Sequence, residues 1–234
     1  MNRNANIVIL TGAGISAESG LQTFRAADGL WEGHRVEDVA TPEAFARDPA
    51  LVHQFYDARR ARLQEVEPNP AHVALARLDA EWRGDLLIVT QNVDDLHERA
   101  GAKRLLHMHG EVLKGWCLAC DERFAWDGPM GIEAVCSSCQ ARGMVRPDIV
   151  WFGEMPYAME DIERALFHAD LFVSIGTSGA VYPAAGFVQT ARHRGARTLE
   201  INLEPSGGSI FFDERRYGRA SELVPEWVEE LISK

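Results

Sequence analysis

The sequence of 234 residues has no long hydrophobic run, no excess of basic side chains and only four cysteines. No apolar stretch approaches the roughly 20 residues that a membrane-spanning helix requires, and the amino terminus lacks the charged head and apolar stretch of a secretion signal. The formal net charge is -11, whereas non-specific binding of nucleic acid requires a basic field. We therefore expect a cytoplasmic protein that binds neither membrane nor nucleic acid and whose acidic surface tolerates or attracts basic polypeptides.

The four cysteines lie in one short segment and form two Cys-x-x-Cys pairs. Cys117 and Cys120 are separated from Cys136 and Cys139 by fifteen residues, a spacing that is typical of a tetrahedral four-thiolate zinc site. Four thiolates leave no coordination position for water, so the predicted zinc ion is structural. A redox dithiol is the competing interpretation, but two pairs at this spacing favour zinc.

Apolar runs alternate with helical patterns along most of the chain. Residues 7–10, 86–89, 171–175 and 198–201 are predicted to be buried parallel strands. The predicted helices are 71–82, 161–169, 183–192 and a last one that begins near Val224-Pro225. With 46% hydrophobic residues the chain can build a sizeable core. The alternation predicts an α/β fold with a parallel sheet that is covered on both faces.

Two segments do not fit this alternation. Residues 41–67 read as helices, and residues 111–146 hold the cysteines. We expect them to form a smaller helical and zinc-binding lobe inserted into a Rossmann-like domain of residues 1–40, 68–110 and 147–234. A cleft between the two parts is the expected ligand site. No long coiled-coil pattern is present, which favours a monomer.

The first predicted strand leads into Gly12-Ala13-Gly14-Ile15-Ser16-Ala17, which fits the glycine fingerprint of dinucleotide-binding folds. A polar stretch from Ser19 to Gly29 follows, where an ordinary dehydrogenase continues with a regular helix and a second strand. No acidic residue ends a clear second strand about 20 residues after the glycines. The pattern therefore predicts a dinucleotide site under a long loop and argues against an oxidoreductase.

Polar residues at predicted strand ends are the candidates for chemistry. Gln91, Asn92 and Asp94 follow the strand at 86–89, at the sheet edge where α/β folds bind ligands. His107 and His109 are two apart, so in a strand they would share one face. Imidazole is a suitable general base near neutral pH, although a single histidine is more often structural. We favour His109 because it directly precedes the zinc insertion. The histidines interpreted as structural are His34, His53, His72, His97, His107, His168 and His193.

Eight short motifs occur in the same order as in one known family, and the chain resembles the sirtuins over nearly its whole length. The matching stretches are Gly12-Ala13-Gly14-Ile15-Ser16, Thr23-Phe24-Arg25, Gln91-Asn92-Val93-Asp94, His107-Met108-His109-Gly110, the two Cys-x-x-Cys pairs, Val150-Trp151-Phe152-Gly153-Glu154, Gly176-Thr177-Ser178 and Asn202-Leu203-Glu204. The resemblance implies that NAD is a consumed co-substrate. It also implies that acyl groups leave the lysines of proteins, with release of nicotinamide and 2′-O-acyl-ADP-ribose.

The resemblance further implies a site for NAD. The implied NAD-binding residues are Gly12, Ala13, Gly14, Ile15, Phe24, Arg25, Trp31, Gln91, Asn92, Asp94, Gly176, Thr177, Ser178, Asn202, Leu203, Glu204 and Ala220. The loop from Ala13 to Trp31 is expected to close over NAD, and His109 to act as general base on the nicotinamide ribose. Without the resemblance, Thr177 and Ser178 are equally well interpreted as caps of the next helix.

The implied acyl-lysine site has two parts. Val150, Phe152, Gly153 and Glu154 match the segment that pairs with a substrate peptide as an added strand. Tyr56 and Arg59, three apart in a predicted helix, match the Tyr-x-x-Arg motif of the sirtuin branch that prefers succinyl- and malonyl-lysine, and Ala40 matches a small residue of that branch. A guanidinium and a phenol are suited to binding a carboxylate.

The competing interpretation of the Tyr56 and Arg59 segment is a basic solvated helix face. We interpret Arg60 and Arg62 as surface charge. For the whole chain, the alternatives are an NAD-dependent oxidoreductase and a non-catalytic zinc- and NAD-binding interaction module. Transfer of ADP-ribose to protein is a third possibility within the family.

Overall fold

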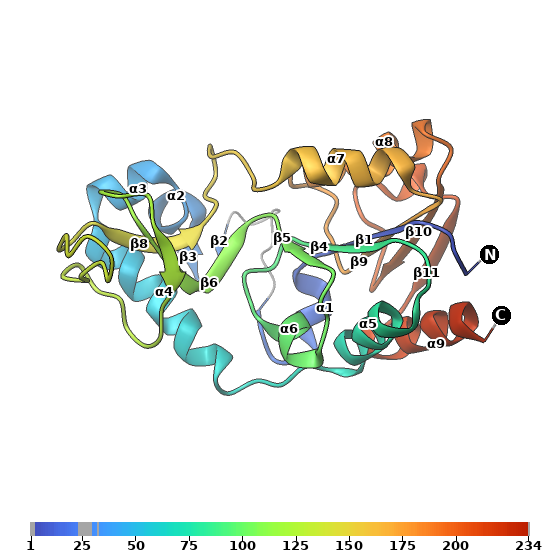
Figure 1. Cartoon of the computed structure of the whole chain (residues 1–234), viewed down its shortest axis with the longest axis horizontal. Coiled ribbons are helices and arrows are strands. Elements are labelled where there is room, and N and C mark those ends of the chain that lie inside the picture. Colours follow the sequence, from blue (N-terminus) through green and yellow to red (C-terminus); the bar gives the residue numbers. More distant parts are fainter. Residues whose placement is uncertain (1–2, 23–29, 32, 234) are drawn as a thin grey trace.

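The centre of the computed structural model, which describes residues 3–22, 30–31 and 33–233, is a parallel sheet (Figure 1). Its strands lie in the order β11-β10-β9-β1-β4-β5, and every neighbouring pair is parallel. Their bounds are β1 Ile7–Thr11, β4 Leu86–Thr90, β5 Leu105–His107, β9 Leu171–Ile175, β10 Arg197–Asn202 and β11 Glu214–Tyr217. The predicted α/β class and the four predicted strands are confirmed.

Both faces of the sheet are buried by apolar cores. Successive side chains of a strand point to opposite faces, so a central strand such as β1 contributes to both cores. Ile7 and Ile9 join one apolar core, whereas Val8 and Leu10 join another. The helices that accompany these cores are α1 Ala13–Ala17, α5 Pro70–Glu81, α6 Leu96–Ala100, α7 Met159–His168, α8 Phe187–His193 and α9 Ala220–Ile232. Figure 1 shows α7 and α8 on one side of the sheet and α5 and α9 on the other.

A second group of elements lies at the other end of the molecule (Figure 1). It comprises β2 Leu30–Trp31, β3 His34–Arg35, α2 Val36–Val39, α3 Pro42–Arg47, α4 Pro49–Leu63, β6 Gly110–Cys117, β7 Arg123–Ala125 and β8 Val145–Ile149. Strands β7-β6-β8 form an antiparallel sheet. The helices and β6 share their own apolar core. Most of residues 41–67 is helical, as predicted, although α4 ends at Leu63. The division into domains stays a prediction.

Short sequence signals set where α3 and α4 of this group begin. Thr41 and Asp48 each cap the helix that follows, accepting hydrogen bonds from the backbone N–H groups of Ala44 (3.0 Å) and Leu51 (3.0 Å). A proline occupies the first turn in both helices, where no backbone N–H is needed.

Two strands of the parallel sheet and the start of one helix differ from the sequence prediction. Strand β5 is short, and β11 is a polar edge strand of sequence Glu-Arg-Arg-Tyr, so neither carries a clear hydrophobic pattern. Helix α9 begins at Ala220, and the prediction that it begins near Val224-Pro225 is wrong. Its first turn is polar, and the backbone N–H of Ser221 donates to Glu18 Oε1 at 3.0 Å, so the apolar pattern starts a turn late.

Candidate active site

The glycine turn after β1 packs directly on the turn after β9. The backbone N–H of Gly14 donates to the carbonyl of Gly176 at 2.8 Å, and that of Gly12 donates to Ile175 at 3.0 Å. A Cβ on Gly14 would lie 2.7 Å from the Gly176 carbonyl oxygen, and Gly176 itself has φ +63. Glycine is therefore required at these positions so that the two turns can pack against each other. Helix α1 is only five residues long, which departs from a regular dinucleotide-binding helix.

Ser16 joins the α1 turn to the loop after β4. Its hydroxyl donates to Asp94 Oδ2 at 3.0 Å and accepts from Asn92 Nδ2 at 3.1 Å. Asn92 Nδ2 also donates to the Gly12 carbonyl at 3.2 Å. Two segments eighty residues apart thus form one buried polar cluster. The structure brings the predicted residues Asn92 and Asp94 together with Ile15, which is fully buried beside Ser16.

Asp94 is a buried carboxyl group. Its side chain is 7% exposed, and burial raises its pKa to about 6, although hydrogen bonds from Leu96 and Ser16 oppose that shift. A carboxyl group with such a pKa changes charge close to physiological pH. It can therefore hold or accept a proton beside a bound ligand.

His109 lies in the turn between β5 and β6. Its Nδ1 is 3.1 Å from the carbonyl oxygen of Gln91. A carbonyl only accepts, so Nδ1 carries the hydrogen and Nε2 keeps its lone pair. Burial lowers the pKa of His109, which keeps the ring neutral near pH 7. Orientation, tautomer and charge all suit a general base.

His107 has a different environment. It ends β5, so the expectation that His107 and His109 share a strand face is wrong. Its Nδ1 is 3.0 Å from the Asn92 carbonyl oxygen and its Nε2 is 2.7 Å from Glu98 Oε1. Although burial opposes it, the contact with Glu98 raises the pKa of His107. Both ring nitrogens are occupied, as the structural interpretation predicts.

A pair of buried histidines, His72 and His97, lies next to the polar cluster of Ser16, Asn92 and Asp94, and the sequence did not indicate this position. The His72 and His97 rings meet edge to face at 5.0 Å, and Nε2 of His72 is 3.4 Å from Ser16 Oγ. Nε2 of His97 is 3.0 Å from Thr11 Oγ1. Burial lowers the pKa of His72 to about 4. The spacing of these residues carries no signal, because α5 and α6 bring them together only in the fold.

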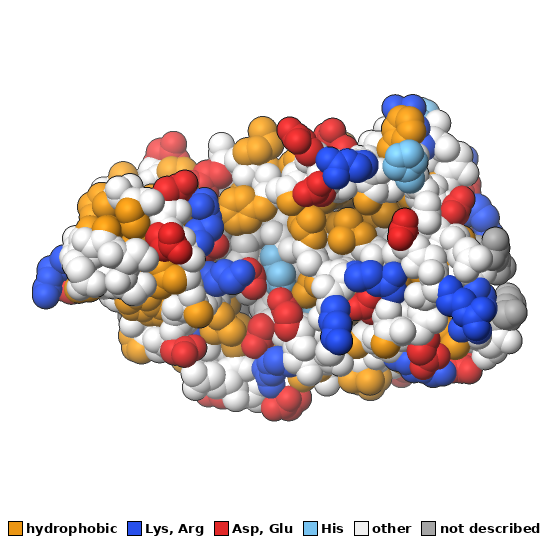
Figure 2. Space-filling model, viewed as in Figure 1, with side chains coloured by type: hydrophobic (Ala, Val, Ile, Leu, Met, Phe, Trp, Pro, Cys, Tyr) orange, Lys and Arg blue, Asp and Glu red, His pale blue; other side chains and the backbone are white. Residues whose placement is uncertain are grey.

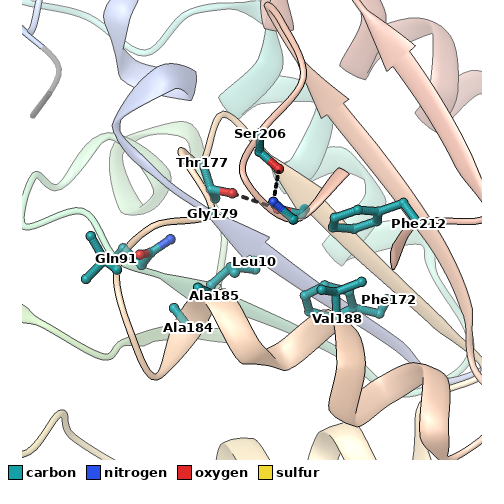
Figure 3. A pocket seen from close by; sticks show the side chains of 13 residues that line it. Leu10, Gln91, Phe172, Thr177, Gly179, Ala184, Ala185, Val188, Ser206 and Phe212 are labelled. Carbon is teal, nitrogen blue, oxygen red and sulfur yellow. Dashed lines mark hydrogen bonds between the residues drawn. The ribbon is translucent and has the colours of Figure 1, made fainter. Parts of the chain in front are cut away.

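A pocket opens at the carboxyl edge of the sheet (Figure 3). Gln91 and Thr177 both line it, as do two residues that the sequence did not indicate, Ser206 and Gly208. The backbone N–H of Gly208 donates to Ser206 Oγ at 3.3 Å. Loops that follow β4, β9 and β10 thus meet at one place, as the carboxyl ends of parallel strands should.

Thr177 and Asn202 connect the loops after β9 and β10. Asn202 Nδ2 donates to the Thr177 carbonyl at 2.8 Å, and the Thr177 hydroxyl is 2.9 Å from Ser174 Oγ. The next helical turn begins only at Ala184 and has no side-chain cap. The alternative that Thr177 and Ser178 cap a helix is therefore wrong. Of the other predicted residues here, Leu203 and Glu204 are exposed and Ala220 opens α9.

Tyr56 and Arg59 face inward from α4. Tyr56 is 0% exposed and Arg59 is 9% exposed, so a solvated basic face is wrong. The guanidinium of Arg59 lies 3.1 Å from the Phe55 ring centroid and 4.8 Å from that of Trp31. Trp31 also meets Tyr56 at 6.1 Å. The structure therefore brings three predicted residues, Trp31, Tyr56 and Arg59, into one cluster of aromatic contacts.

The neighbouring arginines differ from each other. Arg62 is on the surface as predicted, but Arg60 is 1% exposed and its interpretation as surface charge is wrong. Arg60 donates through Nε to the Val112 carbonyl at 2.9 Å and pairs with Asp57. It thereby joins α4 to β6.

The segment from Val150 to Glu154 runs between the two groups of elements. The backbone N–H of Val150 donates to the His109 carbonyl at 2.9 Å, and that of Phe152 donates to the Ala40 carbonyl at 3.0 Å. The segment is thus anchored both to the proposed base and to Ala40. Phe152 and Gly153 are exposed. Phe24 and Arg25 lie outside the described residues.

The four cysteines come together at the end of β6, where Cys117 is the last residue of the strand. Their sulfurs lie within 4.8 Å of one another, with 3.7 Å between Cys117 and Cys139 and 3.8 Å between Cys120 and Cys136. A tetrahedral ion with zinc–sulfur bonds of about 2.3 Å places its sulfurs about 3.8 Å apart. The cysteines therefore fit a structural zinc ion, which would cross-link the two turns.

The two Cys-x-x-Cys turns have the same geometry. The residue after each pair, Asp121 or Gln140, has a positive φ of 63 or 61. Its backbone N–H donates to the carbonyl of the first cysteine of that pair, at 2.9 Å for Cys117 and 3.1 Å for Cys136. The backbone thus presents two sulfurs from each turn to one point.

Fold and site together define an α/β protein with a polar site at the carboxyl edge of its sheet and an attached four-cysteine lobe. A sequence model of the Sir2 family matches residues 12–183. The chain therefore belongs to the Sir2 family, the sirtuins.

Relatives and solved structures agree with this family. A protein of Vibrio vulnificus is 60% identical over 97% of this chain and 94% of its own length, and one of Bdellovibrio bacteriovorus is 58% identical over 97% of both; each is named NAD-dependent protein deacylase. A Sir2 homologue in complex with NAD superposes with a TM-score of 0.89 at 36% identity, covering 99% of this chain and 91% of that one. A Sir2 complex with a p53 peptide and NAD+ superposes with a TM-score of 0.80 at 27% identity, covering 96% and 92%.

Proposed function

We infer that the chain is an NAD-dependent protein deacylase with a preference for acyl groups that end in a carboxylate, succinyl and malonyl above all. The observation that carries the reaction is the neutral imidazole of His109, held through Nδ1 on the Gln91 carbonyl with Nε2 available as a base. The relatives named NAD-dependent protein deacylase support the same reaction.

The proposed reaction consumes NAD. The acyl carbonyl oxygen attacks the anomeric carbon of the nicotinamide ribose as the carbon–nitrogen bond to nicotinamide breaks. Nε2 of His109 takes a proton from the ribose hydroxyls, so that the 2′-oxygen attacks the imidate carbon. Water then completes the release of free lysine and 2′-O-acyl-ADP-ribose. A closed site protects the sugar cation from simple hydrolysis.

The parts of NAD are assigned to separate loops. Ile15, Asn92 and Asp94 form the proposed nicotinamide pocket, a role supported by their burial and by the Ser16 hydrogen bonds that orient the two polar side chains. Gln91 faces the ribose. The loops after β9 and β10, joined by the hydrogen bond between Asn202 and Thr177, hold the adenosine part. By resemblance, Phe24 is assigned to the reacting sugar and Arg25 to the phosphates.

The proposed acyl-lysine site lies where Val150–Glu154 meets α4. The peptide pairs with this segment through its backbone, which reads little of the sequence. Arg59 and Tyr56 bind the acyl carboxylate, and Ala40 leaves room for the longer chain. A zinc ion on the four thiolates supplies structural stability rather than chemistry. A cytoplasmic location and a monomeric state stay predictions.

The acyl preference is tested by exchanging one guanidinium. Arg59→Met keeps the volume near Phe55 and Trp31 but removes the charge, so we expect desuccinylation of one peptide to fall by about 10- to 100-fold. Deacetylation should change far less. Nicotinamide release from NAD with acetyl- and succinyl-lysine versions of the peptide measures both.

Arg62→Met is the matched control, because Arg62 belongs to the same helix and pairs with Glu65 on the surface. It should leave both rates unchanged. Equal losses of both activities in Arg59→Met would reject the acyl-binding role. Intact NAD with every acyl peptide would reject the deacylase reaction itself.

A further inference from the structure

Trp151 belongs to the proposed peptide segment and contacts Tyr56 of the proposed acyl-binding site. Its indole Nε1 donates a hydrogen bond to the Tyr56 hydroxyl oxygen at 2.9 Å. Both side chains are buried, and their rings lie 6.4 Å apart with a 34° tilt. Trp151 is the one residue of the segment that points into the same apolar core as Tyr56.

The indole is held from several sides. The guanidinium of Arg146 lies 3.3 Å from the Trp151 ring centroid, and Phe45 meets the ring at 5.3 Å. Arg146 forms two hydrogen bonds to Glu154, at 2.7 and 3.0 Å. Glu154 in turn accepts from the backbone N–H of Trp151 at 2.9 Å. The ring therefore has little freedom to turn its N–H away from Tyr56.

The donor and the acceptor of the hydrogen bond between Trp151 and Tyr56 are fixed by their chemistry. An indole N–H only donates, so the Tyr56 oxygen is the acceptor and its own hydrogen is not used in the contact. In the described part of the chain, the hydrogen-bond partner that the structure shows for the Tyr56 hydroxyl oxygen is the Trp151 indole. Because a phenol O–H prefers the ring plane, accepting on one side directs its hydrogen to the other side. Accepting one hydrogen bond also polarises the group and strengthens the one it donates.

Tyr56 keeps its proton at all relevant pH values. Burial raises the pKa of the phenol well above its usual value, although the contact with Trp151 opposes the shift. The group is therefore a permanent donor. A carboxylate, which only accepts, is its natural ligand.

We propose that Trp151 is a positioning residue for acyl selectivity, and that its indole N–H aims the Tyr56 hydroxyl at the carboxylate of the acyl group. The inference rests on the proposed acyl preference and adds a residue to it. An acetyl group offers no carboxylate, so it gains nothing from the aimed hydroxyl. Trp151 thus acts on the ratio of desuccinylation to deacetylation rather than on catalysis in general.

Trp151→Phe tests this role, because it keeps an aromatic ring and removes the N–H. We expect kcat/KM for succinyl-lysine peptide to fall about 3- to 10-fold relative to acetyl-lysine peptide. In a Tyr56→Phe background the same exchange should leave the ratio unchanged, because the oxygen that the indole orients is already gone. An equal drop with both substrates, or an undiminished effect in the Tyr56→Phe background, overturns the inference.

Trp116→Phe is the matched control. Trp116 also stacks on Arg146, at 5.0 Å, but its N–H donates to Asp121 at the surface. This variant should keep the ratio. If Trp151→Phe does not fold, 3-benzothienylalanine introduced at position 151 keeps the two fused rings, replaces N–H with sulfur, and must produce the same loss of selectivity.

The two proposals fail in different ways. Wild-type protein that removes succinyl no faster than acetyl rejects the acyl preference, and the Trp151 role with it. Wild-type selectivity that is lost in Arg59→Met but kept in Trp151→Phe rejects the Trp151 role alone.

Discussion

One backbone carbonyl determines the chemical state of His109. The Gln91 carbonyl accepts from Nδ1 at 3.1 Å, and this contact selects the tautomer with a basic Nε2. Two residues earlier, His107 contacts both a carbonyl and the Glu98 carboxylate, which raises its pKa, whereas burial lowers the pKa of His109. Neighbouring histidines thus have opposite pKa shifts because their partners differ.

Replacing the imidazole should abolish turnover. His109→Asn is expected to lower NAD-dependent deacylation by at least about 100-fold while NAD still binds, because the base acts only on the reacting sugar. In the unchanged protein, activity should fall as acid protonates His109. Since burial lowers its pKa, that fall lies below the ordinary 6.5.

A pH–rate profile and an NAD-binding titration measure these effects. His168→Asn is the control, because His168 is exposed on α7. A variant without the imidazole that turns over normally, or an acid limb centred above 6.5, would exclude His109 as the base.

Among the elements, the turns after β1 and β9 depend on each other. Gly12, Gly14 and Gly176 leave no space for a side chain between them, and the Gly14 N–H is used by the Gly176 carbonyl. The glycine fingerprint therefore serves the packing of two loops on which the proposed NAD site is built. Its contribution to the fold is as direct as any contact with a ligand.

Gly14→Ala should destabilise the protein. A helical alanine is intrinsically about 1 kcal/mol better than glycine, but its Cβ would lie 2.7 Å from the Gly176 oxygen. We expect the clash to prevail, with a net loss of about 1–3 kcal/mol in the free energy of unfolding and weaker NAD binding. Urea unfolding and an NAD titration measure the two effects.

Gly186→Ala is the matched control. The nearest atom to its new Cβ, in the Tyr182 ring, is 3.8 Å away, which is an ordinary contact. This variant should be as stable as the parent protein. Unchanged or increased stability in Gly14→Ala would show that the two turns can separate without cost.

Across the whole molecule, charge is spread over the surface while several histidines are buried. Figure 2 shows acidic and basic side chains interspersed over one face. No helix in the described part of the chain is long and apolar enough to cross a membrane. Burial lowers the pKa of four histidines, His53, His72, His97 and His109. Asp94, with a pKa raised to about 6, has the opposite effect on stability.

The fold should lose stability in mild acid. An unfolded histidine binds a proton below about 6.5, whereas folded His72 does so only near 4. The contribution of neutral His72 to the free energy of unfolding is therefore complete above pH 6.5 and is lost as the pH falls toward 4. Between pH 7 and 5 that loss is about 2 kcal/mol for His72. The other three histidines act in the same direction, and Asp94 alone opposes them among these groups.

Urea unfolding at pH 7 and pH 5 measures this dependence. The drop should be smaller in His72→Gln by about the share of His72, roughly 2 kcal/mol. His168→Asn, an exposed histidine, is the control and should show the same drop as the unchanged protein. Equal drops in His72→Gln and the parent would mean that His72 is protonated in the folded state.

The sequence by itself determined the parts that depend on local patterns. Central strands such as β1 and β9 are buried on both faces, so an unbroken apolar run in the sequence predicts them. The cysteine spacing predicted the tetrad because a Cys-x-x-Cys turn positions two sulfurs within a few residues. Edge strand β11 is half exposed and polar, so it left no such pattern, and the polar first turn of α9 concealed where that helix begins.

Only the tertiary structure decided which distant side chains meet. Arg60 reads as surface charge in the helix pattern, yet packing against β6 buries it. Ser16 contacts Asp94, and Trp151 contacts Tyr56 across 95 residues of chain. Such contacts depend on how the sheet and the helices pack. The packing of the whole core sets which distant segments lie side by side, and the local sequence around each residue carries no information about its distant partner.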